Sequence, residues 1–170
     1  MADTLIIRNA ERKDAKEILR YLKNSASQSD FLSYTPDELN ISITDERKYI
    51  DSFKKPNCSF FIAEIADEIV GKITLSGGKT KRTGHVAEVS ISVDKNHWGK
   101  GIGSKLIERA MDWAGKTGIL SKLSLKVNSD NDSAVRLYEH FGFREEGRLI
   151  NDLKVNGKYV DSIIMGKMLK

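Results

Sequence analysis

The sequence predicts a mixed α/β fold, in which helices pack on a largely antiparallel sheet that contains one parallel crossover. Two kinds of segment alternate along the 170 residues: short apolar runs typical of strands, and longer runs with the apolar spacing of helices. Most neighbouring strand segments are separated by short turns, which join antiparallel strands. One pair is separated by a glycine-rich stretch and a helix, and this separation predicts the parallel crossover.

The first half of the chain is predicted to form a strand, two helices and a hairpin. Residues 12–24 place Ala15, Ile18 and Leu22 at helical spacing, and Asp14 is in a position to cap the helix start. The other expected elements are a strand over 4–10, a helix start at Thr35-Pro36, a helix over 45–53, and hairpin strands over 58–65 and 69–77.

The second half adds strands and helices around the crossover. Residues 85–93 alternate Val89, Ile91 and Val93 on one face, which is the period of a strand. Asn156-Gly157 is a strong signal for a two-residue hairpin turn. The other expected elements are a helix over 104–118 that Gly115 and Gly118 end, a strand over 122–128, a helix over 131–143 that Gly142 ends, and two strands within 147–169.

Composition narrows the class of protein. We expect one domain over residues 1–170, with no leader and no membrane span, because no apolar run is long enough for either. The single cysteine, Cys58, excludes an internal disulfide framework and favours the cytoplasm. The net charge of +4 is mild, and the basic run at 79–82 has no interleaved aromatics, so we expect no nucleic-acid partner. Three scattered histidines, His85, His97 and His140, predict no metal site.

The glycine-rich stretch lies between a predicted strand and the start of a helix. Gly99, Gly101 and Gly103 stand where the first backbone N–H groups of the helix have no partner and the helix dipole is positive. Such a loop suits a phosphate group. The spacing matches neither the nucleotide P-loop nor the dinucleotide fingerprint. A tight turn without a ligand is the alternative, and the glycines by themselves leave both open.

A second motif resolves this ambiguity. The loop Trp98-Gly99-Lys100-Gly101-Ile102-Gly103 and, later, Asn131, Ala134, Leu137, Tyr138, Glu139, Gly142 and Phe143 match two signatures in order and spacing. With them the chain resembles the GNAT superfamily of acetyl-CoA-dependent N-acetyltransferases, in particular its bacterial branch of ribosomal-protein N-terminal and small-molecule acetyltransferases. The resemblance implies a central sheet flanked by helices on both faces. Trp98 departs from the family pattern, which has glutamine or arginine there.

The resemblance also implies the site. An amine of a small molecule or a protein N-terminus would attack the thioester of acetyl-CoA directly, in a ternary complex. Acetyl-CoA would bind Ile91, Ser92, Val93, Trp98, Gly99, Lys100, Gly101, Ile102, Gly103, Ser104, Asn131, Ser133 and Tyr138. Asn131 would also cap its helix. The backbone N–H groups of 91–93, above all that of Val93, would serve the thioester oxygen.

The resemblance also implies two catalytic residues. Tyr138 is expected to protonate the departing thiolate. The alternative is that Tyr138 is only an aromatic residue of the core. Glu88 is expected to be the general base, directly or through water, and an ordinary exposed glutamate is the alternative. Strand alternation puts Glu88 on the face opposite Val89, and the resemblance implies a bulge in this strand that would redirect the side chain.

The sequence says least about the identity of the amine acceptor. Acidic residues occur in the segments expected to shape its pocket: Asp30, Asp37, Glu38, Asp152 and Asp161. They would suit a cationic amine, although surface charge and helix capping explain them as well. A non-catalytic acyl-CoA-binding or regulatory module is the alternative function. We also predict a homodimer, because exposed-edge pairing is common in the family.

Overall fold

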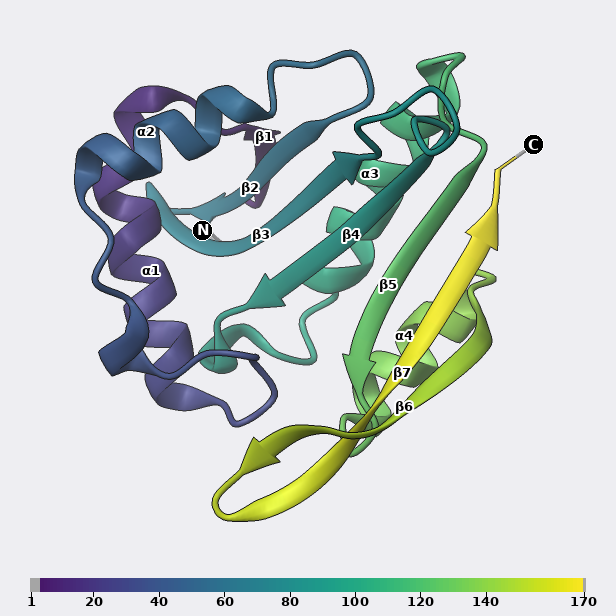
Figure 1. The fold of residues 1–170 in the computed structure, drawn as a ribbon. Helices are drawn as coiled ribbons and strands as arrows, with labels where there is room; N and C mark the ends of the chain where they lie inside the picture. Colours follow the sequence, from purple (N-terminus) through teal and green to yellow (C-terminus); the bar gives the residue numbers. More distant parts are fainter. Residues whose placement is uncertain (1–3, 170) are drawn as a thin grey trace.

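In the computed structural model, which describes residues 4–169, seven strands form one twisted sheet (Figure 1). The strand order is β1-β2-β3-β4-β5-β7-β6. The strands are β1 Ile6–Asn9, β2 Ser59–Ile65, β3 Glu68–Gly77, β4 Val86–Val93, β5 Lys122–Asn128, β6 Arg144–Val155 and β7 Lys158–Met168. The helices are α1 Ala15–Gln28, α2 Ile43–Ser52, α3 Ile102–Lys116 and α4 Asp132–His140. The ends of the predicted domain, residues 1–3 and 170, lie outside the described part.

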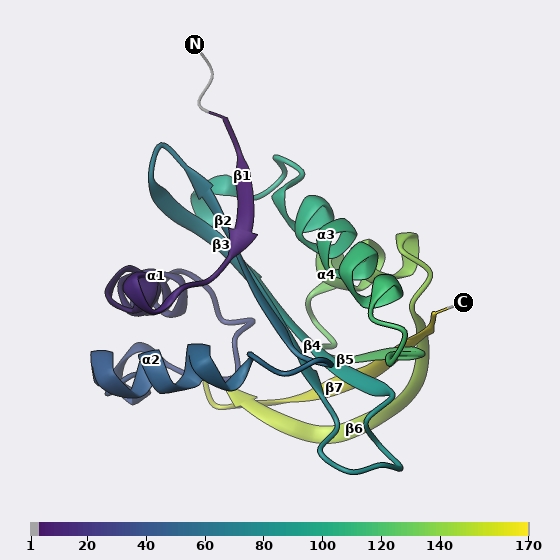
Figure 2. The same cartoon turned by 90° about the horizontal axis from the view of Figure 1, so that it is seen from above.

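Helices cover both faces of the sheet, as predicted. Figure 2 shows α1 and α2 on one face and α3 and α4 on the other. Each face has its own apolar core, because successive strand residues point to opposite sides. Ile18 packs with Phe60 and Ile62 under α1 and α2. Leu106 and Leu123 belong to the larger core under α3 and α4.

A gap between two central strands positions the functional site. β4 and β5 are the parallel pair that the sequence predicts, and they pair over only three residues, Val86–Glu88 with Lys122–Ser124. Beyond this point the strands diverge, as Figure 1 shows. Residues 89–93 of β4 therefore have a strand partner on the β3 side and an opening on the β5 side.

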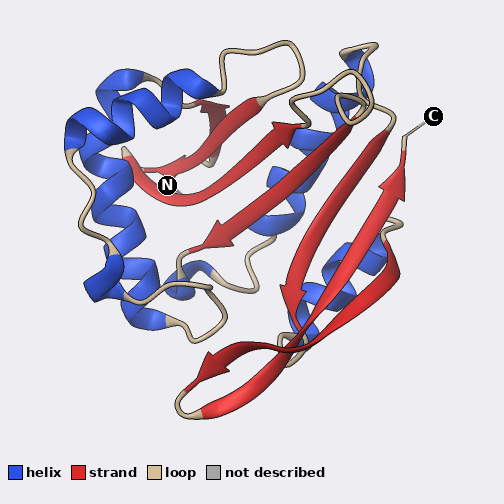
Figure 3. Cartoon of the chain, viewed as in Figure 1, coloured by secondary structure: helices blue, strands red, loops and turns tan. Residues whose placement is uncertain are grey.

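Both hairpin turns that the sequence predicts are present. Ala66 and Asp67 have positive φ between β2 and β3, and so do Asn156 and Gly157 between β6 and β7 (Figure 3). A two-residue hairpin turn of this hand matches the twist of the strands that it joins. In the described residues no helix is long and apolar enough to cross a membrane.

Some helix boundaries were predicted wrongly. Residues 12–14 form a 3-10 turn before α1, and the Asp14 side chain does not cap the helix, because Arg8 donates two hydrogen bonds to its carboxylate. Thr35-Pro36 starts only a 3-10 turn, Pro36–Glu38. Gly115 lies inside α3 rather than ending it. At Asp14 a contact with β1 overrides the local capping preference, and at Gly115 the helix simply continues past the glycine.

Candidate active site

The glycine loop leads from β4 into α3. Gly99 and Gly101 have φ of +73° and +78°, in the left-handed region that favours glycine. Gly101 is the N-cap of α3, so the first N–H groups of the helix point out of its end. Gly103 serves a different purpose, since a Cβ there would lie 3.2 Å from Cδ2 of Leu137 on α4. The loop thus combines an anion-binding helix end with close packing of α3 against α4.

The backbone of β4 offers hydrogen-bonding groups to the gap. The N–H of Asp94 donates to the carbonyl of Val70 on β3, 2.8 Å away. Because the backbone groups of successive strand residues point to alternate edges, those of Ser92 also face β3, whereas those of Ile91 and Val93 face the gap. Of the three N–H groups predicted to serve the thioester oxygen, those of Ile91 and Val93 therefore face the gap and that of Ser92 does not. Ser92 instead presents its side chain, whose Oγ lies 2.9 Å from the hydroxyl of Tyr21 on α1.

Helix α4 supplies the opposite wall. The Asn131 side chain accepts a hydrogen bond from the N–H of Ala134, which confirms the predicted cap. Tyr138 is buried on the inner side of α4 and packs edge-on against Phe143. Burial raises the pKa of the Tyr138 hydroxyl, so this group keeps its proton across the ordinary range of pH.

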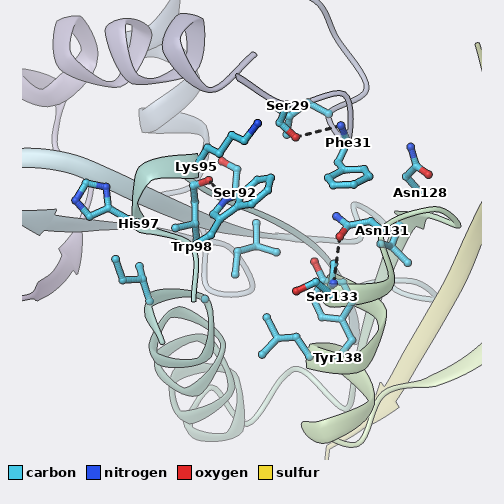
Figure 4. A pocket seen from close by; sticks show the side chains of 18 of the residues that line it. Ser29, Phe31, Ser92, Lys95, His97, Trp98, Asn128, Asn131, Ser133 and Tyr138 are labelled. Atoms are coloured by element: carbon cyan, nitrogen blue, oxygen red, sulfur yellow. Dashed lines mark hydrogen bonds between the residues drawn. The ribbon is translucent and has the colours of Figure 1, made fainter. Parts of the chain in front are cut away.

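Two aromatic side chains meet at the cavity. The indole N–H of Trp98 donates to the carbonyl of Val93, 2.8 Å away, and its ring stacks on Phe31 with 6.3 Å between ring centroids. Phe31 lies in the loop after α1, so the stack joins that loop to the glycine loop. Figure 4 shows these two rings together with Asn131, Ser133 and Tyr138.

These elements enclose one cavity of about 560 Å³. Of the predicted cofactor-binding residues, twelve line it: Ile91, Ser92, Val93, Trp98, Gly99, Gly101, Ile102, Gly103, Ser104, Asn131, Ser133 and Tyr138. Lys100, the remaining one, is exposed beside the cavity. The tertiary structure therefore brings two separate sequence motifs into one space.

Glu88 lies apart from this cavity. β4 pairs with β3 in unbroken register from Val93 to Ala87, so the bulge that we expected to redirect Glu88 is absent from this pairing. Glu88 keeps its alternation, is exposed, and lines a second hollow, of about 480 Å³. Lys126 lines both spaces, which places the second hollow next to the first.

Comparison with known proteins agrees with this geometry. Residues 20–143 match the model of the acetyltransferase (GNAT) family. The chain belongs to the GNAT acetyltransferase family. The spermidine N(1)-acetyltransferase of Vibrio cholerae is 30% identical over 95% of this chain and 91% of its own length. The L-amino acid N-acetyltransferase of Escherichia coli is 28% identical over 67% of this chain and 70% of its own.

Solved structures show the same relationship. A GNAT-family acetyltransferase from Streptococcus pneumoniae has a TM-score of 0.94 and 31% identity, and covers 98% of this chain and 100% of its own. The spermidine N-acetyltransferase of Vibrio cholerae, in complex with CoA and spermine, has a TM-score of 0.75 and 29% identity over 96% of this chain and 95% of its own.

This GNAT chain is an N-acetyltransferase that uses acetyl-CoA as its acetyl donor. The cavity fits that donor. Its glycine loop offers N–H groups at the start of α3, and its gap offers the unpaired strand edge of Ile91 and Val93. Both are groups that a pyrophosphate and an amide-containing arm can use.

We expected the segment 25–40 at the acceptor pocket, and we did not expect it, or the end of β5, to line the cavity of the glycine loop. Ser25, Ser29, Phe31 and Asn128 line the same cavity. The Oδ1 of Asn128 accepts the N–H of Asp130 at 2.8 Å, which leaves its amide NH₂ as the remaining donor. Nothing in the local sequence marks Asn128, because it reaches the site through the packing of distant segments.

Proposed function

We propose that the enzyme transfers acetyl to the primary amine of an acceptor by direct attack in a ternary complex, with Tyr138 as general acid and Glu88 as general base. The observation that carries this proposal is one continuous cavity that holds the start of α3, the free edge of β4 and the hydroxyl-bearing Tyr138, with Glu88 in the adjoining hollow. Bound acetyl-CoA supplies the activated acetyl thioester.

The residues act in a balanced sequence. Glu88 takes one proton from the acceptor ammonium, directly or through water, so that the nitrogen lone pair becomes available. The carbon–nitrogen bond forms and the carbon–sulfur bond breaks, while Tyr138 gives its proton to the departing sulfur. The Tyr138 oxygen then recovers a proton from the nitrogen, and Glu88 releases its own to solvent. The N–H groups of Ile91 and Val93 lie on the strand edge that can stabilise the thioester oxygen.

The raised pKa of Tyr138 supports its part in this sequence. A proton donor must hold its proton until the transition state, and burial favours the neutral hydroxyl. Glu88 is exposed on the sheet face that carries α1 and α2, where an acceptor can approach without displacing the donor.

We further propose that the protein works in the cytoplasm as a homodimer. Its one cysteine, Cys58, favours a reducing compartment. β6 is an edge strand of the described sheet and carries the exposed apolar side chains of Leu149 and Ile150, which suits pairing with a second copy.

The test is release of free CoA thiol from acetyl-CoA with a panel of polyamines, aminoglycosides, amino acids and peptides with free N-termini. We expect turnover with one class, and Tyr138→Phe should lower kcat by roughly 10²-fold while acetyl-CoA still binds. Binding of acetyl-CoA without thiol release from any amine would favour a non-catalytic acyl-CoA-binding module instead.

A further inference from the structure

The second hollow is a polar groove on the sheet. Its polar lining comes from Ser76, Arg82, Thr83, Glu88, Ser124 and Lys126. Ser76 is directly across from Glu88, and Glu88 is across from Ser124, so the three side chains share a face. Thr74 is two residues before Ser76 on β3 and therefore lies on the same face. Thr74 pairs with Phe60 of β2, which packs under α1 and α2. The groove therefore lies on the face of α1 and α2.

The groove adjoins the reaction centre. Lys126 lines it and also lines the cavity of Tyr138, at the end of the gap between β4 and β5. An acceptor held in the groove can thus present its amine at the gap while acetyl-CoA occupies the other cavity. This placement of the acceptor rests on the proposed function.

The groove has one free negative and one free positive charge. Glu88 and Arg82 make no ion pair within 4 Å in residues 4–169. Lys126 is already neutralised, since its Nζ lies 2.8 Å from Oδ2 of Asp152. The groove therefore carries one free charge of each sign, which complements a zwitterion with one amino and one acidic group.

Of the acidic residues expected to hold a polycation, Asp152 and Asp161 are paired with cations, whereas Asp30 and Glu38 accept hydrogen bonds from neutral groups and lie outside the groove. Asp161 pairs with Arg148 at 3.0 Å, and Asp30 accepts the side-chain amide of Asn156 at 3.0 Å. Glu38 accepts the N–H of Thr35 at 2.7 Å. None of these carboxylates lines either cavity. A polyamine with three or four charges would meet a single free carboxylate in the groove, together with the repulsion of Arg82.

We propose that the acceptor is a primary amine with an acidic group beside it, an α-amino acid or a close analogue. Arg82 binds the acidic group through charge-assisted hydrogen bonds, with Lys126 close by, and the amino group faces Glu88. Arginine suits this role because its planar guanidinium matches a carboxylate.

The test compares acceptors that differ only in the acidic group. The twenty L-amino acids, their amides and the corresponding decarboxylated amines are supplied with acetyl-CoA, alongside spermidine, and acetylated products are measured by mass spectrometry. We expect amino acids to exceed their amides at least roughly tenfold in kcat/KM, since hydrogen bonds to charged groups have this weight. Preference for the amides, the decarboxylated amines or spermidine would overturn the inference and leave the proposed function standing.

A variant pair locates the contact. Arg82→Gln should lower kcat/KM roughly tenfold or more for the preferred amino acid. The lower kcat/KM for the amide of that amino acid should not change. Lys81→Gln, from the same loop but outside the groove lining, should change neither rate. An equal loss for acid and amide in Arg82→Gln would contradict the assignment. If acetyl-CoA binds and no amine is acetylated, the proposed function fails, and this inference fails with it.

Discussion

At the scale of single residues, Trp98 has two roles that its place in the glycine loop does not reveal. Its indole N–H donates a hydrogen bond to the carbonyl of Val93, and its ring stacks on Phe31 at the donor cavity. The carbonyl of Val93 faces the gap, so Trp98 decides which backbone groups of that edge stay available. A glutamine or arginine at this position cannot form the same aromatic stack.

The stack predicts a specific pattern of donor affinity. Trp98→Ala and Phe31→Ala should each raise the Kd of acetyl-CoA about fivefold, because an aromatic pair contributes about 1 kcal/mol beyond its buried area. If the pair acts as a unit, the double variant should bind no more weakly than either single variant. Calorimetric titration measures all four proteins, and fully additive losses would refute the coupling.

Tyr138 predicts the shape of the pH profile. Because its pKa is raised, the hydroxyl remains protonated as the solution becomes alkaline, and activity should not fall from loss of this proton below about pH 10. The acceptor ammonium becomes easier to deprotonate over the same range, so kcat/KM should rise with pH. The profile is measured by thiol release, and a falling limb near pH 8 in the wild type but not in Tyr138→Phe would show that the pKa of Tyr138 is not raised.

At the scale of elements, the glycine that precedes α3 and a glycine inside it have opposite roles. Gly101 needs its positive φ to start the helix, whereas Gly115 lies within the helix with open space where a Cβ would be. The first glycine is required by geometry and the second is not.

The two glycines therefore predict changes of opposite sign. Gly101→Ala should lower the free energy of unfolding by about 1 kcal/mol and weaken acetyl-CoA binding, since alanine is strained at positive φ. Gly115→Ala should raise it by about 0.5 kcal/mol, because alanine favours helix and restricts the unfolded chain. Urea unfolding measures both, and an equal effect from the two changes would count against this account of the loop.

At the scale of the whole molecule, one cluster of charges joins β1, β2 and the start of α1. Arg8 donates to Asp14 at 2.8 and 2.9 Å and to Glu64 at 2.6 and 2.9 Å. Burial by itself raises the pKa of Asp14, but the hydrogen bonds from Arg8 and from the N–H of Glu11 outweigh it, and the pKa lies below its ordinary value.

A carboxylate whose pKa is lowered by folding stabilises the protein at pH values above the pKa of the unfolded state, near 4. This stabilisation is lost as the pH falls further. Asp14→Asn should therefore cost about 2 kcal/mol at pH 7, and the difference from wild type should shrink below about pH 4. Asp112→Asn is the matched surface control, with a change of less than about 0.5 kcal/mol. A difference for Asp14→Asn that persists at pH 2.5 would show that the pair does not act through its charge.

The proposed dimer is also tested at this scale. Sedimentation at micromolar concentration should show a dimer, and Ile150→Asp on the β6 edge should convert it to monomer. Ile119→Asp, at an exposed isoleucine in the loop after α3, should leave the dimer intact. A wild-type monomer would refute the proposal.

Much of the fold was predictable because it depends on local pattern. Alternation located β4, helical spacing located α3 and α4, and the Asn156-Gly157 turn fixed the last hairpin, all from neighbouring residues. Helix ends were less predictable, as the Arg8–Asp14 pair shows, because a residue far along the chain or in another element can take the capping group.

The sequence by itself determined the elements, the glycine loop and the helix that carries Tyr138, since each depends on residues close together in the chain. Only the tertiary structure decided that β4 and β5 separate after three pairs, that Ile91 and Val93 face the gap, and that Glu88 lies in a neighbouring groove with Arg82. These features depend on which strands pair and how far, and pairing is set by packing across the whole sheet rather than by any local run of residues.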